Sequence, residues 1–476
     1  MDKEMTRRPS LGARVVKAIG VFSSVEFIKL LCAVIRTKLV AVLIGAAGVG
    51  VISLYNSTLE LLRSVVMLNL GQSAVREVSA AGDLHRAAVA REVGRTALWL
   101  GLFAALVTAC LSPLLSILAF GSTTHIWAFC LLSLSLLAGA VTDARSAVLQ
   151  SFGELRALAR ATLAGVVSGT ILAIPTYIIW RMDAIVPVIL IYAATSLFFI
   201  LRPHVERPAQ TLPSAEVRAL RRRLLGLGAW LTVGAAMGFA ALYILRIWLN
   251  STAGMDVVGR FQAGFTVVNS YVGVIFVAIA LEFYPRLAGV IRSRRATAVM
   301  VSHEIAIALW ILIPIIPLFL CCQHLVVRIL YSSEFDIITQ FLTFAIGGSI
   351  LRAVSWCYSY VILARADGRI YLLTEGTSAV ALVIFGMLGW TYGGYYGLGV
   401  AYFGQFAAFT VATALVFRRR YGMRLSPDVH RLVWMSMAVV FISVALTLWL
   451  GWLGVAVLVP FAAWASFRHL RRLIRK

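Results

Sequence analysis

Apolar segments of about twenty residues follow one another along the whole chain, separated by short polar and charged stretches. An α-helix needs a run of this length to cross the hydrocarbon layer of a membrane, whereas a barrel strand needs only about ten residues. The pattern therefore predicts an all-α integral membrane protein. Fourteen spans are predicted, at residues 19–44, 49–72, 96–119, 125–151, 161–180, 184–201, 224–249, 259–284, 298–327, 338–364, 371–390, 395–417, 432–450 and 452–467.

The distribution of lysine and arginine tests this number of spans. If the N-terminus lies in the cytoplasm, 33 of the 43 Lys and Arg residues fall in cytoplasmic segments, three on the opposite side and seven inside spans. Positive residues gather on the cytoplasmic side of membrane proteins, and one missed helix would scramble the alternation. We therefore expect fourteen spans with both termini in the cytoplasm.

The composition excludes several other classes of protein. Hydrophobic residues make up 61% of the chain and the mean hydropathy is +0.91, whereas soluble domains are about 45–50% apolar. The net charge of +23 would suit nucleic-acid binding, but membrane topology accounts for most of it, so we expect membrane lipids and no nucleic acid as partners. The six cysteines show no CxxC spacing, so neither disulfides nor a metal site is predicted.

Short motifs recur in the two halves of the chain at nearly constant separation. Gly50 and Gly259 are 209 positions apart, and Gly153 and Gly368 are 215 positions apart. Such spacing indicates an internal repeat of two six-helix lobes that insert in the same sense. The predicted divisions are an N-terminal lobe at 1–201, a cytoplasmic linker at 202–223, a C-terminal lobe at 224–420, and two further helices with a basic tail at 421–476.

Charged residues lie inside the predicted spans, where one that faces lipid costs about 3 kcal/mol. In the first span, Glu26, Lys29 and Arg36 lie within about 80° of each other on one helical stripe. In the second span, Glu60 and Arg63 belong to a similar stripe. We predict that the two stripes line one cationic, water-filled cavity. Pairing within one helix is an alternative for three acids: Glu26 with Lys29, Glu60 with Arg63, and Asp143 with Arg145.

Three arginines inside spans have no acidic residue one helical turn away: Arg36, Arg246 and Arg352. Each needs a partner from another helix, a carbonyl group or an anionic ligand. A guanidinium group suits phosphate because it donates two parallel hydrogen bonds. We therefore predict an anionic substrate that carries phosphate.

Several motifs have the order and spacing of a known family. They are Lys38 followed by an apolar run and the turn Gly45-Ala-Ala-Gly48-Val-Gly50, Val258-Gly-Arg-Phe-Gln262, Tyr284-Pro-Arg-Leu287 and Ile329-Leu-Tyr-Ser-Ser-Glu-Phe335. With these motifs, its six-plus-six helices and its cationic interior, the chain resembles the Wzx-type flippases of O-antigen and lipid III in the MOP exporter superfamily. The resemblance covers about residues 18–420. Alanine replaces the proline that the family usually carries in the glycine-rich turn, and the two extra spans resemble those of the lipid II flippase.

This resemblance implies a MATE-like fold and a function. The expected protein moves undecaprenyl-diphosphate-linked oligosaccharide from the cytoplasmic to the periplasmic leaflet of a bacterial inner membrane by alternating access. It would serve the synthesis of a polysaccharide such as the O-antigen of lipopolysaccharide, with the polysaccharide polymerase and chain-length machinery as partners. The implied head-group-binding residues are Lys29, Arg36, Arg63, Arg246 and Arg352. No cofactor is expected beyond a proton or sodium gradient, for which Glu60 and Asp143 are the candidate coupling residues.

Three other functions share parts of this pattern. A lipid II flippase differs only in the head group that it carries. A multidrug exporter of the same superfamily should expose carboxylates to its mostly cationic substrates. The predicted spans here contain seven basic and six acidic residues, which favours an anionic substrate. A membrane polysaccharide polymerase or glycosyltransferase would usually need a large outer loop, which the predicted topology lacks, so we expect a transporter and not an enzyme.

Overall fold

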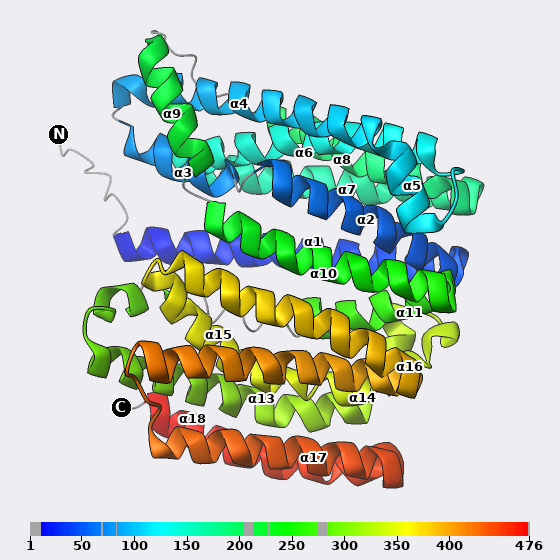
Figure 1. Ribbon diagram of the computed structural model, residues 1–476, viewed down its shortest axis with the longest axis vertical. Coiled ribbons are helices and arrows are strands. Elements are labelled where there is room, and N and C mark those ends of the chain that lie inside the picture. The colour runs from blue at the N-terminus through cyan, green and yellow to red at the C-terminus, as the bar shows by residue number, and fades with distance from the viewer. Residues whose placement is uncertain are drawn as a thin grey trace, which may run out of the picture. The chain divides into compact units, whose positions relative to one another are not determined.

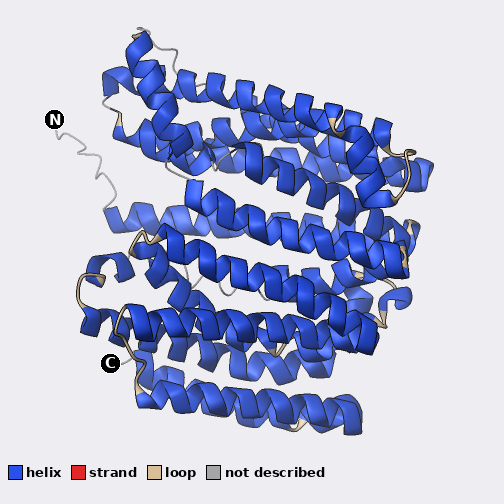
Figure 2. Cartoon of the chain, in the orientation of Figure 1, coloured by secondary structure: helices blue, strands red, loops and turns tan. Residues whose placement is uncertain are grey.

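The computed structural model describes residues 11–67, 70–81, 83–203, 213–226, 229–271, 273, 283–284 and 286–474. Within these residues every regular element is a helix and none is a strand (Figure 2), which confirms the predicted all-α class. The predicted span at 259–284 and the predicted linker at 202–223 lie partly outside the described residues, as does the side chain of Glu26.

Contacts among the helices divide the chain into two compact units. Unit one comprises Met1–Leu43 and Leu62–Ala229, and unit two comprises Ile44–Leu61 and Trp230–Lys476. Unit one contains α1 (Leu11–Leu43), α3 (Leu70–Ala80), α4 (Asp83–Cys110), α5 (Ser112–Phe120), α6 (Ile126–Ser151), α7 (Leu155–Trp180), η1 (Arg181–Ala184), α8 (Ile185–Leu201) and α9 (Ser214–Gly226). Unit two contains α10 (Ala229–Ala253), α11 (Met255–Thr266), η2 (Val267–Tyr271), α13 (Arg294–Leu330), η3 (Ser333–Phe335), α14 (Ile338–Ala345), α15 (Gly348–Ala364), α16 (Gly368–Leu415), η4 (Val416–Arg420), α17 (Pro427–Ala456) and α18 (Leu458–Ile474). Helix α2 (Gly45–Met67) begins in unit two and ends in unit one.

The long apolar helices make this a multi-pass membrane protein. Seven of the described helical segments are long and apolar enough to cross a membrane, or eight if the bent pair α14 and α15 forms one span. Two of the seven are much longer than the roughly 20 residues that one crossing needs: Leu155–Leu201 has 47 residues and Gly368–Arg420 has 53. The first holds α7 and α8, and the second holds both limbs of α16, so each coincides with two of the predicted spans.

Helix α16 turns back at a glycine. Gly394 has φ 53° and ψ −132°, which residues with a side chain rarely adopt. The two limbs then approach closely, because a Cβ atom on Gly389 would lie 2.3 Å from the carbonyl oxygen of Gly397. This break separates the predicted spans 371–390 and 395–417.

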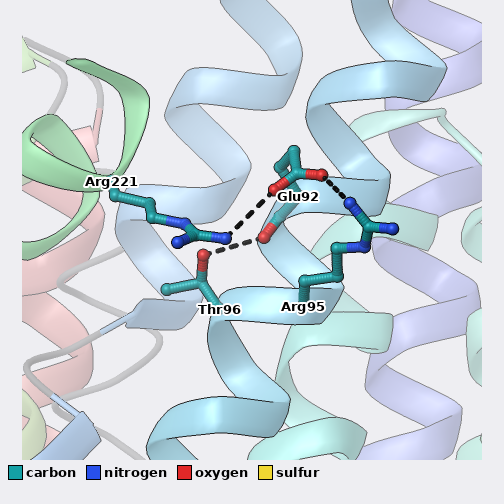
Figure 3. Close-up of polar contacts among 4 residues, drawn as sticks. All are labelled: Glu92, Arg95, Thr96 and Arg221. Atoms are coloured by element: carbon teal, nitrogen blue, oxygen red, sulfur yellow. Dashed lines mark hydrogen bonds and ion pairs between the residues drawn. The ribbon is translucent and has the colours of Figure 1, made fainter. Parts of the chain in front are cut away.

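In unit one, α9 packs against α3 and α4 (Figure 1). Its Leu220 and Leu224 are buried in the apolar cluster that these helices share. Its Arg221 lies 3.4 Å from the carboxylate of Glu92, which Arg95 also binds at 2.7 Å (Figure 3). Residues 214–223 of the predicted linker therefore belong to a helix that apolar contacts and ion pairs hold on unit one.

In unit two, α13 packs against α15, α17 and α18. The buried side chains of these helices form an apolar cluster. Residues Ile44–Leu61 also belong to unit two, although the predicted lobes placed them with the N-terminal half. The remaining lobe boundaries stay predictions.

Candidate functional site

Three of the motifs that carry the family resemblance meet in unit two. A Cβ atom on Gly259 would lie 1.8 Å from the carbonyl oxygen of Ala46 and 2.8 Å from the amide nitrogen of Gly50, so the starts of α11 and α2 touch backbone to backbone. The N–H of Ala46 donates to Glu334 Oε1 at 3.3 Å, and Arg260 Nη2 lies 3.7 Å from the same oxygen. These contacts explain why the first half of α2 belongs to unit two.

Arg246 of α10 is buried among polar side chains from α2 and α11. The residue is only 4% exposed, and its guanidinium group donates to Ser57 Oγ and to Gln262 Oε1. Gln262 is held in turn, because its Nε2 donates to Thr266 Oγ1 at 2.9 Å. The Arg246 Nε–H meets no acceptor among the described residues, while Glu60 attracts the guanidinium group through space. The two oxygens that accept its hydrogen bonds are neutral, so they orient the group without cancelling its charge.

Arg352 of α15 is the second buried cation of unit two. It is 7% exposed, and its Nη1 donates to the backbone carbonyl of Asn269 at 3.4 Å. Its Cζ atom lies 5.0 Å from the ring centroid of Trp356 and 5.7 Å from that of Phe406. Aromatic faces and a carbonyl oxygen stabilise a cation without a full negative charge. Both buried arginines are thus enclosed by protein and do not face lipid.

Unit one holds the predicted cations of the first span on α1. The Cζ atom of Arg36 lies 5.0 Å from the ring centroid of Tyr192 on α8, and the residue remains exposed. Lys29 is half-buried on the same helix. A cation over an aromatic face keeps its N–H donors at the edge of the contact, where an anion can reach them.

Arg63 and Asp143 form an ion pair between α2 and α6 within unit one. Their side chains are 46% and 42% exposed. Arg145 donates instead to the carbonyl oxygen of Pro203 at 2.7 Å. The local pair of Asp143 with Arg145 is therefore wrong, because side chains two positions apart on a helix do not face each other.

Each unit thus holds its own set of the predicted residues. Unit one holds Lys29, Arg36, Arg63 and Asp143, and unit two holds Glu60, Arg246 and Arg352. That both sets line one cavity stays a prediction. No group of three or more His, Cys, Asp or Glu in the described part of the chain could hold a metal ion.

Sequence reasoning missed the neutral partners of Arg246. Gln262 stands in a motif that was already noted, but a glutamine at that position gave no sign of a buried arginine as its partner. Ser57 lies 189 positions from Arg246, and a single serine inside an apolar span is common. These pairs could not be predicted before the packing of the helices was known.

Residues 39–340 match the family described as polysaccharide biosynthesis protein. The chain belongs to the polysaccharide biosynthesis protein family. The matched range contains the glycine-rich turn, Arg246, Gln262 and Glu334. None of the curated proteins matches the sequence of this family member.

Solved structures of membrane transporters share the fold of this polysaccharide biosynthesis protein. A multidrug resistance MATE family transporter of the MOP superfamily, facing inward, matches with a TM-score of 0.66 at 14% identity over 87% of this chain and 99% of that one. The lipid II flippase MurJ, in an inward closed conformation, matches with a TM-score of 0.66 at 11% identity over 97% of this chain and 100% of that one. A MOP superfamily transporter from Pyrococcus furiosus matches with a TM-score of 0.59 at 16% identity, over 86% and 95%. The predicted MATE-like fold and the resemblance to MOP-superfamily flippases are confirmed.

Proposed function

We propose that this protein is a flippase for undecaprenyl-diphosphate-linked oligosaccharide. It moves the lipid-linked glycan from the cytoplasmic to the periplasmic leaflet of a bacterial inner membrane by alternating access of its two lobes. Its termini lie in the cytoplasm, because this orientation places most of the Lys and Arg residues on the cytoplasmic side. Membership of the polysaccharide biosynthesis family supports a glycan substrate, and the MOP-type fold supports transport.

The observation that carries this proposal is the environment of Arg246. A buried guanidinium group loses several kcal/mol of hydration, and a structural arginine usually regains it from a paired carboxylate. Arg246 instead donates to two neutral oxygens, and its Nε–H has no acceptor in the described residues. A diphosphate can accept these donors and offset the lost hydration.

The other cations complete the proposed head-group site. Arg352 carries its charge between aromatic rings in unit two, and Lys29, Arg36 and Arg63 lie on the first two helices of the chain. As the lobes alternate between inward-facing and outward-facing states, the diphosphate moves from some of these cations to others. In the proposal, Asp143 releases Arg63 when it takes up a proton, and protonation of Glu60 removes a negative charge that attracts Arg246 without binding it.

Deletion of the gene, followed by mass spectrometry of lipid-linked intermediates, tests the substrate class. We expect undecaprenyl-diphosphate-linked oligosaccharide to accumulate and to disappear when the wild-type gene is restored. Complementation by Arg246→Ala should fail, whereas Arg246→Lys should restore part of the transport because it keeps the charge but loses the planar fork. If no lipid-linked glycan accumulates and the deletion strain becomes sensitive to cationic dyes, the protein is a drug exporter and the proposal is wrong.

A lipid II flippase is the second candidate. The MurJ structure matches 97% of this chain, so its likeness extends over α17 and α18, whereas the MATE structures match 85% to 88%. The same deletion strain separates the candidates, because loss of a lipid II flippase would accumulate the peptidoglycan precursor and arrest growth.

A further inference from the structure

A separate cavity lies in unit two, between the first turns of α13, the start of α17 and the end of α18. Its volume is about 980 Å³, at the upper end of the usual range for ligand pockets. Three arginines line it: Arg295, Arg424 and Arg431. His303 and His469 also line it, and Asp428 is the carboxylate among its lining residues.

The three arginines are exposed, and no ion pair or hydrogen bond engages their guanidinium groups within the described residues. By contrast, Arg420, which comes just before the same loop, is bound to Asp367 at 2.9 Å. With one carboxylate beside three guanidinium groups, the cavity carries a positive surplus. The cavity therefore favours an anion.

Aromatic and aliphatic side chains also line the same cavity. Trp310 of α13 stacks on His469 of α18 with ring centroids 4.2 Å apart and planes at 10°. Val299 and Met435 line the cavity one helical turn after Arg295 and Arg431, and they are 63% and 43% exposed, so apolar surface lies open beside the arginines. A ligand that fits must have both an anionic group and apolar chains.

The length of α13 places the cavity at the membrane surface. Its 37 residues would extend about 55 Å, whereas the hydrocarbon layer is about 30 Å thick. Arg295 is the second residue of α13, and Arg424 precedes α17, so both stand at the polar end of long apolar helices. In the proposed topology this end is cytoplasmic, where anionic lipids concentrate.

We propose that this cavity binds an anionic glycerophospholipid, with its phosphate at the three arginines and its chains along Val299 and Met435. The backbone of the site is held independently of the ligand. The N–H of Ser426 donates to Ser302 Oγ at 3.1 Å, and Ser426 caps α17 by accepting from the N–H of Val429. The bound lipid would join α13, α17 and α18 at one end of the unit.

The test uses the purified full-length protein, stripped of lipid and placed in nanodiscs of phosphatidylcholine with increasing phosphatidylglycerol, with bound lipid counted by native mass spectrometry. We expect one tightly bound phosphatidylglycerol in the wild type. The double variant Arg424→Gln/Arg431→Gln should weaken binding roughly 30-fold, because each basic residue near an anionic lipid contributes about a factor of five. The matched control Arg418→Gln/Arg419→Gln removes the same charge outside the cavity and should bind as the wild type does.

Two further arms keep the result interpretable. Arg424→Lys/Arg431→Lys keeps the charge and should recover most of the binding, which separates lost attraction from misfolding. Equal binding by the pocket and control variants, or equal binding of phosphatidylcholine, would overturn the proposal. Displacement of the lipid by millimolar inorganic phosphate would also overturn it, because the site would then select free anions. None of these measurements requires glycan transport, so they test the lipid site separately from the proposed function.

Discussion

The contact between Gly259 and the start of α2 makes a sharp prediction about Gly259→Ala. Real Cβ atoms essentially never come within 3.0 Å of another heavy atom, and the added Cβ would lie 1.8 Å from the Ala46 carbonyl oxygen. The two helices must therefore separate by about 1.2 Å or more. Because the obstacle is backbone and cannot rotate away, we expect the upper end of the overpacking range, about 3 kcal/mol.

Thermal unfolding of the purified protein in detergent measures this effect. A loss of about 3 kcal/mol should lower the melting temperature of this 476-residue chain by roughly 3 °C, because the entropy of unfolding grows with chain length. Gly238→Ala in α10 is the matched control, since its added Cβ meets nothing within 4 Å, and it should leave the melting temperature unchanged or raise it slightly. If both variants melt with the wild type, α2 and α11 do not touch, and the assignment of Ile44–Leu61 to unit two is wrong.

Three further substitutions probe other parts of the molecule. Asp143→Asn should change the free energy of unfolding by less than about 1 kcal/mol, because its ion pair with Arg63 is nearly half exposed. The same variant should make transport insensitive to an imposed proton gradient, and a retained response would exclude Asp143 from coupling. Glu92→Gln should raise hydrogen exchange of α9 about tenfold, because the buried carboxylate that holds Arg221 loses its charge, and unchanged exchange would show that apolar contacts alone hold that helix. Gly394→Ala should lower the melting temperature, because the left-handed turn disfavours a side chain, and an unchanged value would contradict the break seen in α16.

Much of the fold could be predicted from hydrophobic pattern alone. An apolar run of sufficient length must form a helix in a membrane, because its backbone groups find no other hydrogen-bonding partners there. The hairpin in α16 was also predictable, because the glycines around Gly394 permit a turn between two apolar runs. The glycine-rich turn before Gly50 and the motif at Gly259 were recognised, and they proved to be packed on each other.

The partners of the charged residues were less predictable because they depend on packing between distant segments. The spacing of Asp143 and Arg145 suggested a local pair, yet Asp143 binds Arg63, which is 80 positions away. In the segment predicted as a linker, the sequence shows only a run of arginines. It does not show that Arg221 of this segment binds the buried carboxylate of Glu92. Spacing along one helix fixes which side chains share a face but not which other helix they meet.

The central claim is that Arg246 binds the diphosphate of the transported lipid. It is tested most directly by the rate at which undecaprenyl-diphosphate-linked oligosaccharide crosses the bilayer of reconstituted vesicles. We predict that Arg246→Ala lowers this rate about tenfold or more in protein that remains folded, and that Arg246→Lys retains part of it. Transport at the wild-type rate by Arg246→Ala would contradict the account.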